Sequence, residues 1–321
     1  MHANNKISAN GVGEVDINLT PFLNHYKDGH IERLLKSPFV AASEDPTANR
    51  GVATRDVVID LGTGVSARLY LPSRATMAGR RLPLVVYIHG GSFCTESAFC
   101  RTYHGYATSL AAAAGVLVVS VEYRLAPEHP IPTAYDDAWY ALRWAAALSD
   151  PWLAGHVDPD RTFLAGDSAS GNIAYHTVVR AGRDGMGIEG MIMVQPFFWG
   201  AERLPSEEVW DGVSVLDVTR VGLLWPFVTA GLAGNDDPRI KPSDEEIASL
   251  TGSSSTTTCM IEAYSGGTLK IGGERGKAAA VAAFKKAKCG LFTGPVRPNK
   301  AYKGPSAAAL PGGTQVIKNY F

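Results

Sequence analysis

A serine that lies between a short apolar run and a helix-compatible segment is the residue of this chain best placed to do chemistry. The run Phe163–Gly166 leads into Asp167 and Ser168, and a helical pattern begins directly after the serine. A strand, a tight turn and a helix in this order lift one hydroxyl above the end of a sheet. The same turn directs backbone N–H groups and the positive end of the helix dipole at one point. Ser168 is therefore the candidate nucleophile.

A second motif could supply the hydrogen-bond donors that such a serine needs. His89-Gly90-Gly91-Ser92-Phe93 directly follows the apolar run Leu84–Ile88. Small residues at this place allow backbone N–H groups to face a ligand. We expect the N–H groups of Gly90, Gly91 and Ala169 to form an oxyanion hole, in which one donor contributes about 3–4 kcal/mol to catalysis. A Gly-x-Ser or a His-Gly-Gly alone is common in ordinary turns, but the two motifs together favour this function.

The immediate neighbours of these groups are expected to line a substrate pocket, and they are Ser92, Phe93 and Asp167. Asp167 is adjacent to Ser168 in sequence, so its side chain points elsewhere and it is not the acid of a catalytic triad. The fifth position of the Gly-x-Ser-x-Gly pattern is Ser170, with Gly171 one place later. We expect the close contact between strand and helix to be strained or shifted there.

The flanking pattern alternates strands with helices. Val57–Asp60 and Val65–Tyr70 alternate at period two around a glycine-rich turn, which predicts a hairpin. Continuous apolar runs predict buried strands, and Ala-rich or amphipathic segments predict helices. The predicted strands are 84–88, 116–121, the run before Ser168, and 188–198; the predicted helices are 103–114, which ends at Gly115, 134–148, and the segment after Ser168. Repeated strand–helix units imply a mostly parallel, doubly wound α/β sheet.

The ends of the chain differ from this core. Residues 1–20 are expected to be loosely ordered, and 31–35 form a short amphipathic piece. Residues 1–251 carry 20 basic and 29 acidic residues, whereas residues 252–321 carry 10 and 2. Residues 252–258 have the composition of a linker, 277–288 could form a basic helix, and 259–264 and 315–317 are short strand candidates. The change of charge marks a boundary in composition.

The overall composition excludes several classes of function. The formal net charge of −1 gives no field that would favour nucleic acid. The four cysteines form no Cys-x-x-Cys pair and no metal-binding spacing, which favours a reduced intracellular protein without a metal or other cofactor. The N-terminal residues lack the apolar stretch of a signal peptide, and no run is long enough to span a membrane. A cytoplasmic location, or a nuclear one, is the resulting expectation.

In these motifs the chain resembles the plant carboxylesterases of the hormone-sensitive-lipase-like branch of the α/β-hydrolase fold, and the resemblance extends over about residues 15–251. The matching stretches are His89–Phe93, Glu122–Pro130, Asp137–Trp139 with Leu142–Trp144, Gly166–Asn172 and Asn235–Ile240. The resemblance implies hydrolysis of small carboxylic esters by a Ser–His–Asp triad without a cofactor. Residues 199–230 break the alternation of strands and helices and hold Trp199, Trp210 and Trp225, which favours a cap inserted over the strand ends; the alternative is a surface excursion with buried tryptophans. The expected organisation is an N-terminal segment with the first antiparallel strands over 1–80, a hydrolase core over 81–251 that contains the cap, and an atypical basic region over 252–321 in which the last strands and helix are incomplete.

The chain departs from this family at two members of the triad. No histidine follows His176, and the place expected for the acid reads Gly266-Gly267-Thr268-Leu269. His176 lies eight residues beyond Ser168, about 12 Å by helical rise, so it is not within reach. His89 is expected to be structural, and neither His104 nor His129 is a good base. The simplest hypothesis is that residues 252–321 are foreign to the fold, through a frameshift, mis-splicing or gene-model error, and that the product is poorly soluble or locally disordered.

Three functions follow from this reading. The first is a carboxylic ester hydrolase whose activity is doubtful, because without a base the serine hydroxyl is a weak nucleophile. The second is a non-catalytic protein that binds a small hormone-like ligand, since the gibberellin receptors of this branch keep the serine and lack the histidine. The third is a dehydratase, because some relatives dehydrate hydroxylated isoflavanones in the same pocket. The expected partner is a small-molecule ester or hormone-like ligand, with no nucleic acid and no membrane.

Overall fold

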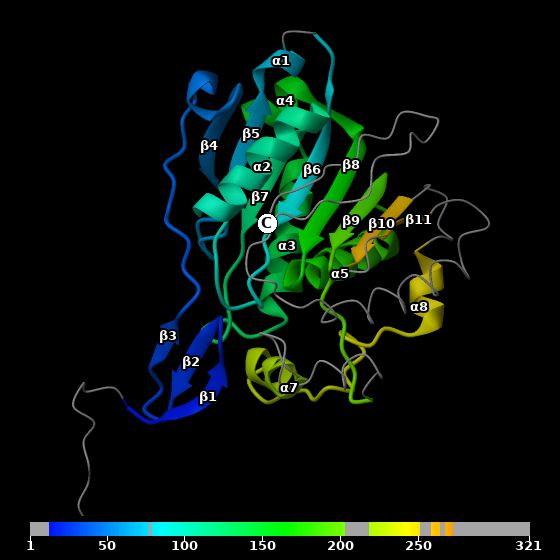
Figure 1. Cartoon of the computed structure of the whole chain (residues 1–321). Coiled ribbons are helices and arrows are strands. Elements are labelled where there is room, and N and C mark those ends of the chain that lie inside the picture. Colours follow the sequence, from blue (N-terminus) through cyan, green and yellow to red (C-terminus); the bar gives the residue numbers. More distant parts are fainter. Residues whose placement is uncertain (1–12, 77–78, 203–217, 251–257, 264–266, 272–321) are drawn as a thin grey trace, which may run out of the picture.

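The computed structural model describes residues 13–76, 79–202, 218–250, 258–263 and 267–271, and two sheets organise this part of the chain (Figure 1). A small N-terminal sheet has the order β1-β2-β3, and a large one has the order β11-β10-β9-β8-β6-β7-β5-β4. The strands are β1 (Val15–Leu19), β2 (Leu23–Tyr26), β3 (Ile31–Arg33), β4 (Val52–Val58), β5 (Ser66–Pro72), β6 (Leu82–Ile88), β7 (Leu117–Glu122), β8 (Val157–Asp167), β9 (Gly190–Val194), β10 (Thr258–Ala263) and β11 (Gly267–Ile271). The helices are η1 (Pro46–Asn49), α1 (Ser73–Thr76), α2 (Arg101–Ala114), α3 (Thr133–Ala146), α4 (Pro151–His156), α5 (Ala169–Arg183), α7 (Val218–Val228) and α8 (Asp244–Ser249).

The large sheet is mostly parallel, as the alternation of strands and helices predicts. Strands β10, β9, β8, β6 and β7 pair in parallel, while β4, β5 and β11 are antiparallel to their neighbours. The predicted hairpin is β4–β5, in which Val58 pairs with Ser66. Helix α2 ends where predicted, because Gly115 adopts the left-handed conformation and its N–H binds the carbonyl of Ala111.

Helices cover both faces of this sheet, which explains the continuous apolar runs. Leu84, Val86 and Ile88 of β6 are buried in the larger core with residues of α3 and α5. Val85 and Tyr87, which point to the opposite face, are buried with residues of α2. A strand whose two faces are both covered has no position that favours a polar residue, so its sequence reads as apolar throughout.

Helix α7 and the N-terminal sheet lie together at the carboxyl ends of the parallel strands (Figure 1). The ring of His25 on β2 makes an edge contact with Phe227 of α7 at 5.8 Å between centroids. Arg33 of β3 donates to the carbonyl of Cys94 at 2.7 Å and forms a bidentate pair with Glu128. These contacts fix the small sheet against the loops that follow β6 and β7.

The expectation of a loosely ordered N-terminus is wrong for its last residues. Residues 15–19 form β1, and Leu19 at its end is 2% exposed in the main core. Alternation of Val15, Ile17 and Leu19 with polar residues is a short strand signal, and it was outweighed by the polar composition of the preceding residues. Residues 31–33, read only as an amphipathic piece, are strand β3.

The C-terminal expectations are tested only in part. The strand expected at 259–264 is β10, which continues the sheet in parallel with β9. Gly267, Thr268 and Leu269, which stand where the triad acid would be expected, belong to β11, which is antiparallel to β10. The linker was expected over 252–258, but Thr258 is the first residue of β10, and the rest of that segment lies outside the described residues. The basic helix over 277–288 and the strand over 315–317 also lie outside them, and the domain boundaries remain predictions.

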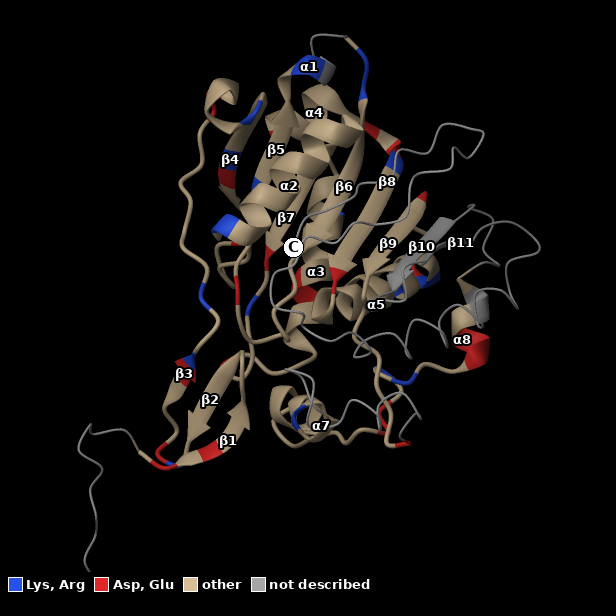
Figure 2. Cartoon of the chain, viewed as in Figure 1, with Lys and Arg blue, Asp and Glu red and all other residues tan. Residues whose placement is uncertain are grey.

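Charge is distributed without a dominant patch on the described elements seen in Figure 2, where acidic residues mark α8 and β1 and basic residues mark α1. None of the described helices has the length and apolar composition needed to cross a bilayer. Among the described residues, no group of His, Cys, Asp or Glu is arranged to hold a metal ion.

Candidate active site

Ser168 lies between the last residue of β8 and the first residue of α5, in a backbone conformation that few non-glycine residues adopt. Its φ is 52° and its ψ is −121°. This conformation turns the chain sharply, and such strain is characteristic of functional sites. Gly166 permits the turn, because a Cβ there would lie 2.4 Å from the carbonyl oxygen of Ser170. The strand–turn–helix arrangement predicted around Ser168 is therefore present.

Ser170, which stands where the nucleophile pattern calls for glycine, is accommodated by hydrogen bonds to the turn itself. Its hydroxyl donates to the main-chain carbonyl of Asp167 at 2.7 Å and accepts the N–H of Asp167 at 2.9 Å. The residue is fully buried. The close helix contact falls on Gly171, where a Cβ would lie 2.7 Å from Cβ of Pro196. The serine thus reinforces the turn, and the next residue provides the close approach.

The N–H of Gly90 does not point at Ser168, which corrects the role expected for it. It donates to Oδ1 of Asp167 at 3.0 Å. In the part of the chain that the structure describes, the N–H groups of Gly91, Ser92 and Ala169 have no hydrogen-bond partner. The donors available near Ser168 are therefore those of Gly91, Ser92 and Ala169, one residue further along the turn than expected.

Asp167, which is expected to line a substrate pocket, holds the turn through three hydrogen bonds. Its Oδ1 accepts from the Tyr87 hydroxyl at 2.8 Å as well as from Gly90, and its Oδ2 accepts from the Tyr103 hydroxyl at 3.0 Å. Burial raises the pKa of this carboxyl, while the hydrogen bonds from the two tyrosines and Gly90 oppose the shift. Because all three partners are donors, they stabilise the ionised form. Asp167 therefore ties the nucleophile strand to the loop after β6.

The side chains of Ser92 and Phe93 are covered by protein. Ser92 is 4% exposed, and the Phe93 ring is fully buried. The centroid of that ring lies 5.8 Å from those of Phe197 and Trp225, in edge contacts with both. Phe197 is itself linked to the nucleophile, because its N–H donates to the carbonyl of Ser168 at 2.7 Å. Phe93 therefore builds an aromatic support between the turn and α7.

None of the histidines in the described part of the chain hydrogen-bonds to Ser168. His89 donates from Nδ1 to the carbonyl of Gly90 at 2.7 Å, and burial lowers its pKa to about 4, so the ring is neutral and structural. The Nε2 of His176 donates to the carbonyl of Arg239 at 2.7 Å, and burial lowers the pKa of this ring also. His129 is exposed.

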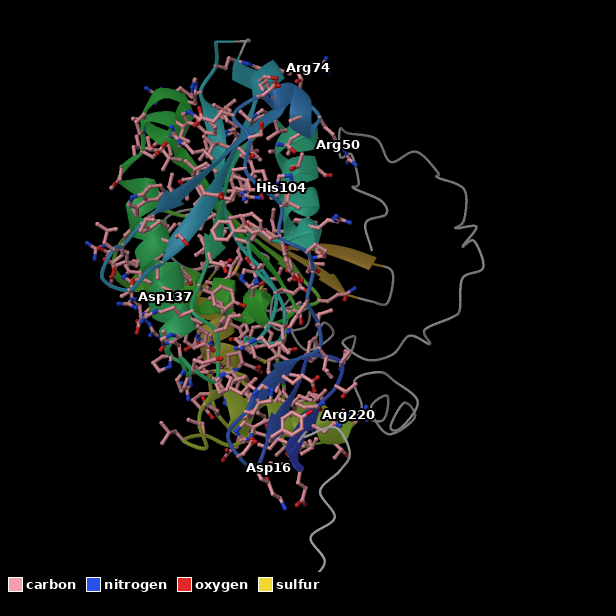
Figure 3. All side chains as sticks on the ribbon, turned by 90° about the vertical axis from the view of Figure 1, so that its left-hand side faces the viewer. Asp16, Arg50, Arg74, His104, Asp137 and Arg220 are labelled. Atoms are coloured by element: carbon pink, nitrogen blue, oxygen red, sulfur yellow. The ribbon has the colours of Figure 1, made fainter. Side chains whose placement is uncertain are left out.

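Both ring nitrogens of His104, a residue of α2, are hydrogen-bonded to residues other than Ser168. Arg68, which is fully buried, donates to its Nδ1 at 3.1 Å, and its Nε2 donates to Oδ1 of Asn49 at 3.1 Å. Figure 3 shows His104 of α2 in the half of the molecule away from Asp16 of β1. His89, His104 and His176 are thus each held by hydrogen bonds to groups other than Ser168.

The tyrosines and the threonine that hold the turn were not found from the sequence. Tyr87 and Tyr103 bind Asp167, Tyr123 donates to the carbonyl of His89 at 3.1 Å, and Thr95 binds the carbonyl of Gly91 at 2.9 Å. The sequence does give an indication for Tyr87, because a tyrosine in an otherwise apolar buried strand needs a hydrogen-bond partner for its hydroxyl. Nothing local in the sequence marks Thr95.

Several known proteins resemble this chain in sequence or in fold. The family described as alpha/beta hydrolase fold matches residues 85–265. A 2-hydroxyisoflavanone dehydratase from Glycyrrhiza echinata is 43% identical over 244 residues, covering 71% of this chain and 72% of that protein. The amyloplastic tuliposide A-converting enzyme b1 from Tulipa gesneriana is 41% identical over 244 residues, and its match covers 74% of this chain but 62% of that protein. Probable carboxylesterase 13 from Arabidopsis thaliana is 40% identical over 257 residues, covering 74% and 77%.

Solved structures give the same fold. The esterase LipW from Mycobacterium marinum has a TM-score of 0.54 at 27% identity, covering 76% of this chain and 71% of that one. Carboxyl esterase 2 from Tuber melanosporum has a TM-score of 0.55 at 20% identity, covering 70% and 71%. At that identity the second likeness concerns the fold alone.

Proposed function

Because the chain belongs to the α/β-hydrolase fold family and is a carboxylesterase-type hydrolase by family, we propose that it binds small carboxylic esters at Ser168 and cleaves them slowly. The observation that carries this proposal is the conformation of Ser168, which presents its hydroxyl at the end of β8, where N–H groups of the adjoining turns have no hydrogen-bond partner among the described residues. An ester carbonyl oxygen is the acceptor that such donors suit.

The donors of Gly91, Ser92 and Ala169 would stabilise the negative charge that forms on the carbonyl oxygen when Ser168 attacks. Removal of a single donor of this kind costs about 2.7–4 kcal/mol in other enzymes, so the arrangement alone accelerates the reaction. Helix α5 begins at Ala169, and its N-terminal dipole favours the same charge. These features support binding and polarisation of an acyl group.

Proton removal from Ser168 is the step for which the described residues offer no group. The serine hydroxyl has no hydrogen-bond partner among them, and each buried histidine is engaged elsewhere. Without a general base, a serine hydroxyl remains a weak nucleophile. We therefore infer that acylation is slow and limits turnover.

Hydrolysis of p-nitrophenyl acetate by the purified chain tests this proposal, with the Ser168→Ala variant as the control. Weak hydrolysis that disappears in the variant would support it. Binding of the ester analogue p-nitroacetanilide by both proteins, without turnover by either, would favour a binding protein. If neither protein binds nor hydrolyses, the site is not an acyl site and the proposal fails.

A second candidate is the removal of water from a hydroxylated substrate, favoured by the 43% identity to a 2-hydroxyisoflavanone dehydratase. In that reaction the donors would hold the carbonyl oxygen while the proton on the carbon between the carbonyl and the hydroxyl-bearing carbon passes to solvent, and the hydroxyl group then leaves, so that one water is lost and a carbon–carbon double bond forms. Incubation with a 2-hydroxyisoflavanone, followed by the change in ultraviolet absorption on dehydration, separates this candidate from ester hydrolysis.

A further inference from the structure

Every carbonyl of the turn formed by His89, Gly90, Gly91 and Ser92 is held by a hydrogen bond from the protein. The carbonyl of His89 accepts from the Tyr123 hydroxyl, and that of Gly90 accepts from the His89 ring. The carbonyl of Ser92 accepts from Sγ of Cys94 at 2.8 Å. The turn is therefore oriented through its acceptors, while the donors of Gly91 and Ser92 stay without partners among the described residues.

The carbonyl of Gly91 accepts three hydrogen bonds, and two of them come from Thr95. It accepts the N–H of Cys94 at 3.0 Å, the N–H of Thr95 at 2.9 Å and the hydroxyl of Thr95 at 2.9 Å. Thr95 is fully buried. A Cβ on Gly91 would lie 2.2 Å from the carbonyl oxygen of Thr95, so the two residues are in direct contact.

The orientation of that carbonyl determines where the next N–H points. The peptide bond between Gly91 and Ser92 is trans, and in a trans peptide the carbonyl and the N–H point in opposite directions. Fixing the Gly91 carbonyl toward Thr95 therefore turns the Ser92 N–H away from Thr95. Ser92 and Phe93 have φ values of 55° and 63°, a conformation that non-glycine residues keep only when their surroundings hold it.

We propose that Thr95 is a positioning residue whose hydroxyl, through the Gly91 carbonyl, aims the Ser92 N–H at the anion that forms beside Ser168. The proposal rests on the function proposed above. It assigns a role to a buried threonine whose hydroxyl binds Gly91 and not Ser168. It predicts that the loss of this hydroxyl weakens anion binding without unfolding the protein.

Three variants test it, and the chain offers a matched control. Thr95→Val removes the hydroxyl and keeps the shape of the side chain, and Thr95→Ser restores the hydroxyl. Thr108→Val makes the same change on α2, at a threonine that is 4% exposed and whose hydroxyl has no partner among the described residues. Thermal melts of all three check that each folds.

Phenylboronic acid is the probe for the anion. Its boron accepts an oxygen lone pair of Ser168, the new boron–oxygen bond makes the boron tetrahedral and negatively charged, and the hydroxyl proton leaves to solvent. The boron-11 chemical shift distinguishes this tetrahedral adduct from the free trigonal acid. We expect Thr95→Val to bind about fivefold to tenfold more weakly than the wild type, as the loss of one hydrogen bond predicts, and Thr95→Ser and Thr108→Val to bind as the wild type does.

A second measurement needs no ligand. In nitrogen-15 relaxation dispersion, the amides of Gly91 and Ser92 should show exchange on the microsecond-to-millisecond scale in Thr95→Val and none in Thr108→Val. Equal dispersion and equal boronate affinity in these two variants would overturn the role of Thr95. Absence of a tetrahedral adduct in the wild type would instead contradict the proposed function, and the relaxation data would then decide the role of Thr95 alone.

Discussion

Strain at single residues of the turn after β6 contributes to the geometry of the site. Ser92 has a φ of 55°, which costs a non-glycine residue about 1 kcal/mol or more. We expect Ser92→Gly to raise the free energy of unfolding by up to about 1 kcal/mol, because glycine adopts this conformation without strain. Urea denaturation at pH 7 measures the difference.

Ser109→Gly is the matched control for that substitution. Ser109 lies within α2, where glycine is unfavourable by about 0.5–1 kcal/mol, so the same change should lower stability there. If Ser92→Gly proved no more stable than the wild type, the turn would not be strained at Ser92.

At this scale the sequence predicted which residue types would gather at the site but not how their bonds are shared. Ser168, Gly91 and Ala169 lie where the two motifs indicated. The motifs do not indicate that the Gly90 N–H, expected to face a ligand, donates to the carboxylate of Asp167. A motif reports that backbone donors and an acid are adjacent in the fold. Which donor meets which acceptor depends on peptide orientations, and those are fixed by Tyr103, Tyr123 and other residues distant in sequence.

The contact between the helix that follows the nucleophile and the loop after β9 depends on one glycine. A Cβ on Gly171 would lie 2.7 Å from Cβ and 2.9 Å from Cα of Pro196. We expect Gly171→Ala to lower the free energy of unfolding by about 1–3 kcal/mol, because the helix must move to admit the methyl group. Chemical denaturation followed by circular dichroism measures the loss.

Gly182, on the same helix, provides the comparison. A Cβ there meets nothing within 4 Å, so Gly182→Ala should stabilise the protein by about 0.5–1 kcal/mol through the helix preference of alanine. Equal effects of the two substitutions would show that Gly171 is not a site of close contact.

Elements with a clear period were predictable from the sequence, and short elements were not. The strand and helix around Ser168, β6, β7, α2 and α3 agree with the patterns in type and nearly in extent. The strand expected over 188–198 is only Gly190–Val194, because Pro196 ends the pairing and the aromatic residues beyond it are buried without belonging to the sheet. Strand β1 depended on contacts with β2 and α7 that no local pattern reveals.

The stability of the whole molecule should depend on pH through the fully buried His89 and the partly buried Glu122, which act in opposite directions. Burial raises the pKa of Glu122 to about 7 and lowers that of His89 to about 4. The folded protein keeps the Glu122 proton up to about pH 7, whereas the unfolded chain releases it near 4.5, so this group costs stability as pH rises through that range. The unfolded chain binds a proton at His89 below about 6.5, so this group costs stability as pH falls from there toward 4.

Glu122→Gln separates the two contributions, because glutamine keeps an acceptor for Ser97 and Ala98 but does not titrate. Relative to the wild type, the variant should gain stability as pH rises from about 4.5 to about 7, and the difference should be constant outside this range. Urea midpoints of both proteins at half-unit intervals of pH give the result. A difference that does not vary with pH would mean that Glu122 has the same pKa in the folded protein as in the unfolded chain, and would contradict the prediction.

The whole-molecule architecture was accessible from the sequence because a mostly parallel sheet with covered faces leaves a strong apolar signal, and the family resemblance agrees with the matches to known hydrolases. The surroundings of Ser168 were harder to predict from the sequence. Arg33 of β3, Trp225 of α7 and Asn172 of α5 each bind loops far away in sequence, and together they hold the carboxyl end of the sheet. Such long-range contacts carry no local pattern.

The pH profile of acylation tests most directly whether Ser168 reacts without a general base. The initial rate of p-nitrophenol release from p-nitrophenyl acetate is measured from pH 5 to 9, and the rate of Ser168→Ala is subtracted at each pH. Without a base, the remaining rate should be slow and should rise steadily with pH, with no inflection between 6 and 7. A fast rate that reaches a plateau above an inflection in that interval would show that an imidazole takes the Ser168 proton, and would contradict the account.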